Sequence, residues 1–206
     1  FTDITIPDAV NNISPAAFDD CINLKSITVS EKNPTFSSSD GVLLNKTGQL
    51  LIRCPQGRKR DYQVPATVTE ISTAAFYRCS ALTSITIPDG VITIRNDAFR
   101  ECSSLGTVNI PQALTTMGSF AFASCESLES VNVPSGVTSI GSFAFHDCKN
   151  LKSVGLSAKV ASIGNNAFDG CAALTGLALP AKLTSIGSNA FQGCTGLSSL
   201  TLPARL

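Results

Sequence analysis

Eight cysteines are the residues with the most obvious chemical potential in this 206-residue chain. Seven occupy one position of a repeated pattern, six of them at intervals of 23 residues: Cys21, Cys79, Cys102, Cys125, Cys148, Cys171 and Cys194. This spacing lacks the CxxC pairs of a structural zinc site. Stacked units would bring neighbouring members within disulfide range, about 5 Å at Cα, but seven in-register side chains cannot all pair. We expect the column to fill a small buried slot as free thiols.

Two other residues invite a chemical interpretation. Cys54 lies off the column, so we expect it to be the most reactive thiol. His146 is the single histidine, which excludes a cluster of histidine ligands, and no motif places a serine or cysteine nucleophile beside it. We expect a solvated turn residue there. Acidic residues are scattered, with no pair at a spacing typical of general acid–base catalysis. The sequence therefore predicts no enzymatic activity, no metal and no cofactor.

Each 23-residue unit predicts three elements. The first, such as LTSITIP from Leu82, is a short β-branched strand closed by a proline, which cannot donate to a ladder. The second, such as VTSI from Val137, is another brief extended segment. The third, such as SFAFHDC from Ser142, is one helical turn or a tight loop. Glycines that suit a positive φ or a close backbone approach precede it, at Gly118, Gly141, Gly164 and Gly187.

Repetition at this period indicates a solenoid, in which each unit buries its apolar face against its neighbours. We expect one right-handed, β-rich array over residues 1–206, with parallel strands, short helical turns and an enlarged repeat at 24–58. Because the chain stops within a unit at Leu206, we also expect it to be a fragment of a longer protein, or to have ends that pack on another chain. Fifteen basic and fifteen acidic residues argue against a nucleic-acid binder. No apolar run approaches the roughly 20 residues that span a bilayer, which argues against membrane insertion.

The unit LxxLxLPxxVxxIxxxAFxxCxx resembles the treponemal-type leucine-rich repeat of the BspA-like family. The stretch Leu24 to Arg58 resembles the enlarged repeat of this family through Asn33-Pro34, Phe36 and the DGVL segment from Asp40. Ser157 departs from the proline slot and Met117 from the usual isoleucine. The resemblance implies a secreted or cell-surface protein of bacteria or protists that binds host or microbial macromolecules, and it transfers no catalytic residues.

Two surfaces are candidates for such binding. Ser and Thr occupy the outward slots of the strands, which predicts a flat polar face; this could be an ordinary solvated face, a contact surface for protein or carbohydrate, or an ice-binding face. The enlarged repeat predicts a hairpin around Asn45 to Gly48, with basic residues following it. Because a uniform field cannot fix the register of a partner, we expect an acidic or glycan-bearing partner to dock beside this hairpin. The residues expected to contact the partner are Arg53, Arg58, Lys59, Arg60, Tyr62, Ser84 and Thr86.

The sequence thus favours an extracellular, non-catalytic binding module for a protein or glycan. The alternative is a structural spacer that presents another domain. Exposed aromatic or charged side chains gathered on one face would favour binding, whereas a uniform Ser/Thr surface would favour the spacer.

Overall fold

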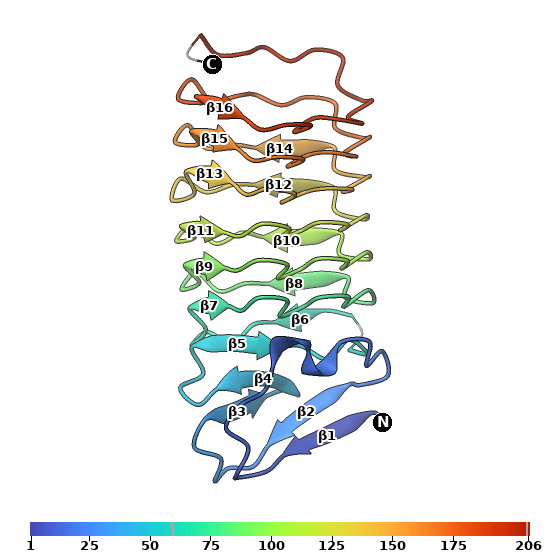
Figure 1. Ribbon diagram of the computed structural model, residues 1–206, viewed down its shortest axis with the longest axis vertical. Coiled ribbons are helices and arrows are strands. Elements are labelled where there is room, and N and C mark those ends of the chain that lie inside the picture. The colour runs from blue at the N-terminus through green and yellow to red at the C-terminus, as the bar shows by residue number, and fades with distance from the viewer. Residues whose placement is uncertain (59, 205) are drawn as a thin grey trace.

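The computed structural model describes residues 1–58, 60–204 and 206, and it shows a stack of coils (Figure 1). A regular coil contributes a first strand, a second strand and a tight turn, except that the coil of β16 has an isolated bridge at Gly176 in place of the first strand. The first-strand column comprises β6 (Tyr62–Gln63), β8 (Ser84–Thr86), β10 (Thr107–Asn109), β12 (Ser130–Asn132) and β14 (Ser153–Gly155). The second-strand column comprises β7 (Glu70–Ile71), β9 (Thr93–Ile94), β11 (Thr116–Met117), β13 (Ser139–Ile140), β15 (Ser162–Ile163) and β16 (Ser185–Ile186).

The pairing within both columns is parallel and follows the repeat, so that Ile85 of β8 lies opposite Val108 of β10. The turns form a third ladder, in which a backbone N–H donates to the following coil, as from Phe76 to the carbonyl of Ala98 at 2.7 Å. The solenoid expected from the period is confirmed: equivalent residues of successive coils supply the hydrogen-bond partners that a single unit lacks.

A column of phenylalanines forms the centre of the core. The rings of Phe76, Phe99, Phe122, Phe145 and Phe168 are fully buried. Successive rings are stacked, with centroids 4.9 Å apart for Phe76 and Phe99 and 5.7 Å apart for Phe168 and Phe191. The expectation that each phenylalanine packs on its equivalent is confirmed, and this shared face makes one continuous apolar core out of units that could not fold alone.

The cysteine column lies beside the rings, and all eight cysteines are free thiols. The thiol of Cys125 donates to the carbonyl of Phe99, one coil earlier, at 3.1 Å, and Cys148 makes the same bond to Phe122. The expected buried slot is confirmed for the six regular members. The expectation for Cys54 is wrong: it is fully buried and burial raises the pKa of its thiol, whereas Cys21 is the cysteine with partial exposure.

The alternatives expected for the third element were a helical turn and a tight loop. The regular coils have tight turns, and a helical turn, the 3₁₀ helix η1, forms at Pro15–Phe18. Of the two roles expected for the four glycines, close backbone approach is confirmed: a Cβ on Gly118 would lie 2.5 Å from the backbone nitrogen of Asn96. Positive φ falls two residues later, for example at Asp97 and Asn166, residue types that tolerate it.

Residues 1–58 are built differently. The parallel pair β1 (Asp3–Ile6) and β2 (Ser26–Val29) is followed by an antiparallel meander of β3 (Phe36–Ser39), β4 (Val42–Asn45) and β5 (Leu50–Arg53). The expected hairpin between β4 and β5 is confirmed. A second hairpin between β3 and β4 was not expected; it turns at Asp40 and Gly41, both with positive φ. Pairing of β5 with β7 then joins this meander to the regular coils.

Candidate interaction surface along the turn edge

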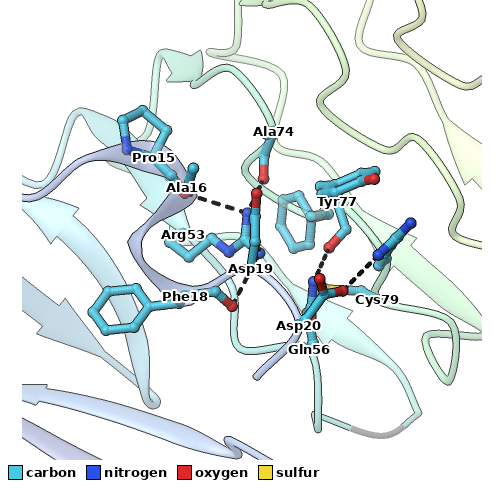
Figure 2. A network of polar contacts seen from close by, with 12 residues as sticks. Pro15, Ala16, Phe18, Asp19, Asp20, Arg53, Gln56, Ala74, Tyr77 and Cys79 are labelled. Carbon is cyan, nitrogen blue, oxygen red and sulfur yellow. Dashed lines mark hydrogen bonds and ion pairs between the residues drawn. The ribbon is translucent and has the colours of Figure 1, made fainter. Parts of the chain in front are cut away.

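Arg53, the first residue expected to contact a partner, lies inside the molecule with 1% of its surface exposed. Figure 2 shows its guanidinium among the ends of two turns. It pairs with the carboxylate of Asp19 at 2.8 Å, donates to the carbonyl of Ala74 at 2.8 Å, and reaches the carbonyls of Pro15 and Phe18 at 3.5 Å. The expected role in partner contact does not fit this burial, since every one of these groups belongs to the chain itself. Arg53 instead clamps the first unit onto the regular coils.

Tyr62 is also buried, and its burial raises the pKa of the phenol. Its ring packs on Phe76 with centroids 5.9 Å apart, and the guanidinium of Arg58 lies 4.7 Å from the ring centroid. Arg58 also pairs with the exposed carboxylate of Asp40. Both members of this stacked pair therefore have partners within the chain, and Tyr62 does not offer an exposed anchor.

Among the described residues, the remaining expected contacts are Arg60, Ser84 and Thr86, of which Arg60 alone is basic. Lys59 lies outside the described residues. Arg60 is exposed, as is Thr86 at the end of β8, whereas Ser84 donates to the carboxylate of Asp61 at 2.8 Å. Hydrogen bonds from Ser84 and its neighbour Thr83 hold the pKa of the Asp61 carboxyl below its usual value.

The polar strand face is present, with Thr107, Asn109, Ser130 and Asn132 all exposed. It is periodic, since Thr107 lies opposite Ser84 and Ser130 opposite Ser153. A periodic field of small polar groups presents the same contacts at each coil, so it does not select one position for a partner.

The turns carry a surface of a different kind, which the sequence analysis did not single out. Aromatic and cationic side chains replace the small or polar residues found at equivalent slots of later coils, such as Asn166, Asn189 and Gln192. We call this surface the turn-edge strip. Its members are Tyr77, Arg78, Arg100, Phe120, Phe143 and His146, all partly exposed.

Contacts within the turn-edge strip are continuous over four coils. The guanidinium of Arg100 lies 5.8 Å from the ring centroid of Tyr77 and 5.2 Å from that of Phe120. Phe120 stacks on Phe143 with centroids 4.5 Å apart, and His146 meets Phe143 edge-on at 5.5 Å. The side chains therefore support one another in a fixed arrangement, which lowers the entropy lost on binding.

Carboxylates flank the cations of the turn-edge strip. Arg78 pairs with Asp20 and with Glu101, whose carboxylate lies 2.8 Å from its Nε. Arg100 pairs with Asp97 at 3.2 Å. An open hollow of about 240 Å³ lies at this end of the strip, lined by Asp19, Ala74, Tyr77, Asp97 and Arg100. The strip is consequently mixed in charge rather than basic.

The two phenylalanines of the strip have left-handed backbones, with φ of 57° at Phe120 and 59° at Phe143. A bulky side chain in this region is uncommon and costs about 1 kcal/mol or more relative to asparagine or glycine. The same slot has a positive φ in the other regular coils, at Ala74, Asp97, Asn166 and Asn189, so the turn imposes this backbone and the phenylalanines are its unusual occupants. The signal in the sequence was the doubled SFAF motif, which places an extra aromatic residue in a slot that other coils fill with Ala, Asp or Asn.

Within the described residues, no group of three His, Cys, Asp or Glu side chains is arranged to hold a metal ion. The two ring nitrogens of His146 face carboxylates: Nε2 lies 3.4 Å from Asp147 and Nδ1 lies 3.5 Å from Asp169. A search of the same residues finds no helix with the length and apolarity needed to cross a membrane.

Three of the solved structures that this chain resembles are described here by their similarity to it. A leucine-rich repeat protein of Eubacterium ventriosum is 28% identical with a TM-score of 0.74, over 100% of this chain and 61% of that protein. A leucine-rich cell surface protein of Faecalibacterium prausnitzii is 30% identical with a TM-score of 0.77, over 98% and 52%. The leucine-rich repeat protein of T. pallidum is 29% identical with a TM-score of 0.66, over 96% and 78%. The chain thus spans little more than half the length of the first two.

No curated protein matches the chain. The BspA type leucine rich repeat region matches it in 6 copies, over residues 1–40, 59–175 and 120–206. Similarity to proteins of this type supports a binding or structural role. With most of its length covered by these copies, the chain belongs to the BspA-type leucine-rich repeat family.

Proposed function

We propose that this chain is a non-catalytic, extracellular or cell-surface module that binds another protein through the turn-edge strip. The observation that carries the proposal is the continuous contact of Tyr77, Arg100, Phe120 and Phe143 on one edge of an otherwise repetitive surface. Tyr and Arg are enriched among the residues that dominate binding energy. The strip breaks the periodicity, so it can fix a partner in one register.

The chemistry of the strip favours a protein over a polyanion or a sugar. Its arginines already pair with Asp20, Asp97 and Glu101, so little uncompensated positive charge remains for a polyanion. The ring faces of Phe120 and Phe143 cover each other, so neither ring offers both faces to a sugar. Ring edges beside paired charges match the mixture of apolar and polar groups that protein interfaces use.

The test also distinguishes two alternatives: a structural spacer, and binding through the basic region after the hairpin. A structural spacer would need no such strip, and its surface would be uniform. The basic region after the hairpin, where Arg60 is exposed and Arg58 is partly covered, is the second candidate contact and would suit an acidic or glycan-bearing partner.

The test compares three purified proteins on immobilised extracellular-matrix proteins and on a glycan array. The strip variant takes residues that this chain itself uses at the same slots: Tyr77→Gln, Arg100→Gln, Phe120→Asn and Phe143→Asn. The control variant is Arg58→Ala with Arg60→Ala. We expect the parent and the control to bind a matrix protein, and the strip variant to bind at least about ten-fold more weakly with thermal stability close to that of the parent.

Each other result has a defined meaning. Equal binding by parent and strip variant removes the strip from the contact. Loss of binding in the control alone assigns the contact to the basic region, and binding to glycans alone excludes a protein partner. Failure of the parent to bind any protein or glycan favours the spacer.

A further inference from the structure

Both strand columns are interrupted at the same joint, between the coil of residues 105–127 and the coil of residues 128–150. β10 pairs with β8, and β12 pairs with β14, but β10 does not pair with β12. In the second column β11 pairs with β9 and β13 with β15, again without pairing across this joint. Figure 1 shows these strands farther apart than their neighbours. The structure describes every residue of both coils, so the missing strand pairs are not due to undescribed residues.

One strand-side hydrogen bond crosses this joint, from the N–H of Glu129 to the carbonyl of Gly106 at 3.4 Å, but a second donor lacks the acceptor that its equivalents have. At the preceding joint the N–H of Gly118 donates to the carbonyl of Ile94 at 2.9 Å, and at the following joint Gly164 donates to Ile140 at 2.9 Å. The N–H of Gly141 occupies the same position, yet the structure shows no acceptor for it among the described residues. The joint therefore has fewer strand-side hydrogen bonds than the joints before and after it.

The turn edge continues across the joint. The N–H of Phe122 donates to the carbonyl of Ala144 at 2.9 Å, and that of Ser124 donates to His146 at 2.7 Å. The buried ring column is also continuous, with Phe122 and Phe145 stacked at 5.7 Å. The two coils thus share a core and the turn ladder, while the strands of neither column are paired across the joint.

Gly136 and Met117 distinguish this joint from its neighbours. A Cβ on Gly136 would lie 2.3 Å from the carbonyl oxygen of Leu114, whereas one on Gly90, at the equivalent place, would be 3.9 Å from its nearest neighbour. The two coils are therefore displaced relative to each other. Met117 lies at this joint in the slot that Ile94, Ile140 and Ile163 fill in other coils. An unbranched side chain packs less well than isoleucine on a pleated, stacked surface.

We propose that this joint is a built-in weak point that divides the solenoid into two cooperative blocks. The stability of a repeat array is the sum of the intrinsic stabilities of its units and of the interfaces between neighbours. An interface without strand pairing in either column opens before interfaces whose columns are both paired, so the coils on either side fluctuate as separate units. The Phe120–Phe143 stack crosses the joint, which places the two halves of the turn-edge strip on different blocks. This inference stands without the proposed function, because it concerns the chain alone.

Hydrogen–deuterium exchange followed by mass spectrometry tests the proposal on the intact chain. We expect amides of residues 130–132 and 138–141 to exchange at least about ten-fold faster than those of residues 153–155 and 161–164, which occupy the same slots in the next coil. Equal protection of the two sets would overturn the proposal.

Three substitutions test whether the fast exchange is local to this joint or reflects the stability of the whole chain. Met117→Ile should slow exchange at residues 138–141 by several-fold, because it restores the side chain used in other coils. Gly136→Ala should accelerate exchange there, because its Cβ meets Leu114, while the matched control Gly90→Ala should leave its own joint unchanged. Neither glycine has a positive φ, so the comparison isolates the contact. A uniform change across all coils, or equal effects of the two alanines, would show that the joint is not special.

Discussion

The regular coils and the enlarged repeat bury different kinds of side chain. In the described part of the chain, the buried polar or charged residues are Asn33, Arg53 and Gln56, and all three lie within residues 24–58. In the regular coils many backbone groups find their partners one coil away, through the strand pairs and the turn ladder. Where the chain leaves the repeat, that partner is missing and a side chain takes its place.

Asn33 shows this substitution most completely. Its amide nitrogen donates to the carbonyls of Pro7 and Val10 at 2.7 and 2.8 Å, and its amide oxygen accepts from the N–H groups of Thr35 and Phe36. One side chain thus satisfies four backbone groups. The comparison teaches that a solenoid tolerates an irregular repeat when polar side chains replace the lost ladder, at the cost of depending on a few individual residues.

The largest expected effect follows from that dependence. Arg53→Ala should lower the free energy of unfolding by about 3 kcal/mol, because it leaves Asp19 and the carbonyl of Ala74 without their donor. Chemical denaturation measures the change. The control Arg95→Ala removes the exposed pair with Glu70 and should cost about 1 kcal/mol or less. Similar losses for the two variants would mean that Arg53 is not a clamp.

An effect that is smaller for each residue should appear at alkaline pH, and it belongs to the regular coils. Burial raises the pKa of Cys148 to about 12 and that of Cys194 to about 11, from an ordinary value of 9.0. The folded chain keeps protons that unfolded thiols release, so the stability supplied by these thiols is complete below pH 9 and is lost as the pH rises through the folded values. Between the unfolded and the folded pKa, each buried thiol lowers the free energy of unfolding by about 1.4 kcal/mol for every pH unit of increase.

Urea unfolding at pH 8, 9.5 and 10.5 measures this dependence. Replacement of Cys148 and Cys194 by alanine provides the control, since it removes two of the groups that titrate. We expect the double variant to lose less stability between pH 8 and 10.5 than the parent does. An identical pH dependence would assign the effect to other residues.

The smallest effect changes a rate of modification and leaves stability untouched. Cys21 is partly exposed in the first unit, while Cys54 and the regular cysteines are buried. We expect a thiol reagent to label Cys21 first in the native protein and the other seven only as the chain opens. Peptide mapping after timed labelling gives the order. Early labelling of Cys54 would contradict its burial and would support the expectation from the sequence that Cys54 is the most reactive thiol.

Repetition made much of the fold predictable. A slot that recurs in every coil has the same neighbours throughout, so the positions of Phe99 and Cys102 in one unit indicate where Phe122 and Cys125 pack in the next. The candidate surface was less predictable. Basic residues close in sequence suggested a contact around Arg53 and Tyr62, but both side chains are buried because the meander folds them against the first unit and the ring column.

The sequence by itself determined the period, the parallel stack, the buried thiol column and the hairpin between β4 and β5, since each follows from spacing or from local turn chemistry. Only the tertiary structure decided which side chains share an environment across coils. It turned Arg53 inward, joined Tyr77 to Phe143 through Arg100 and Phe120, and left the joint at Met117 unpaired. These outcomes depend on contacts between residues of different coils, which no local pattern of residues encodes.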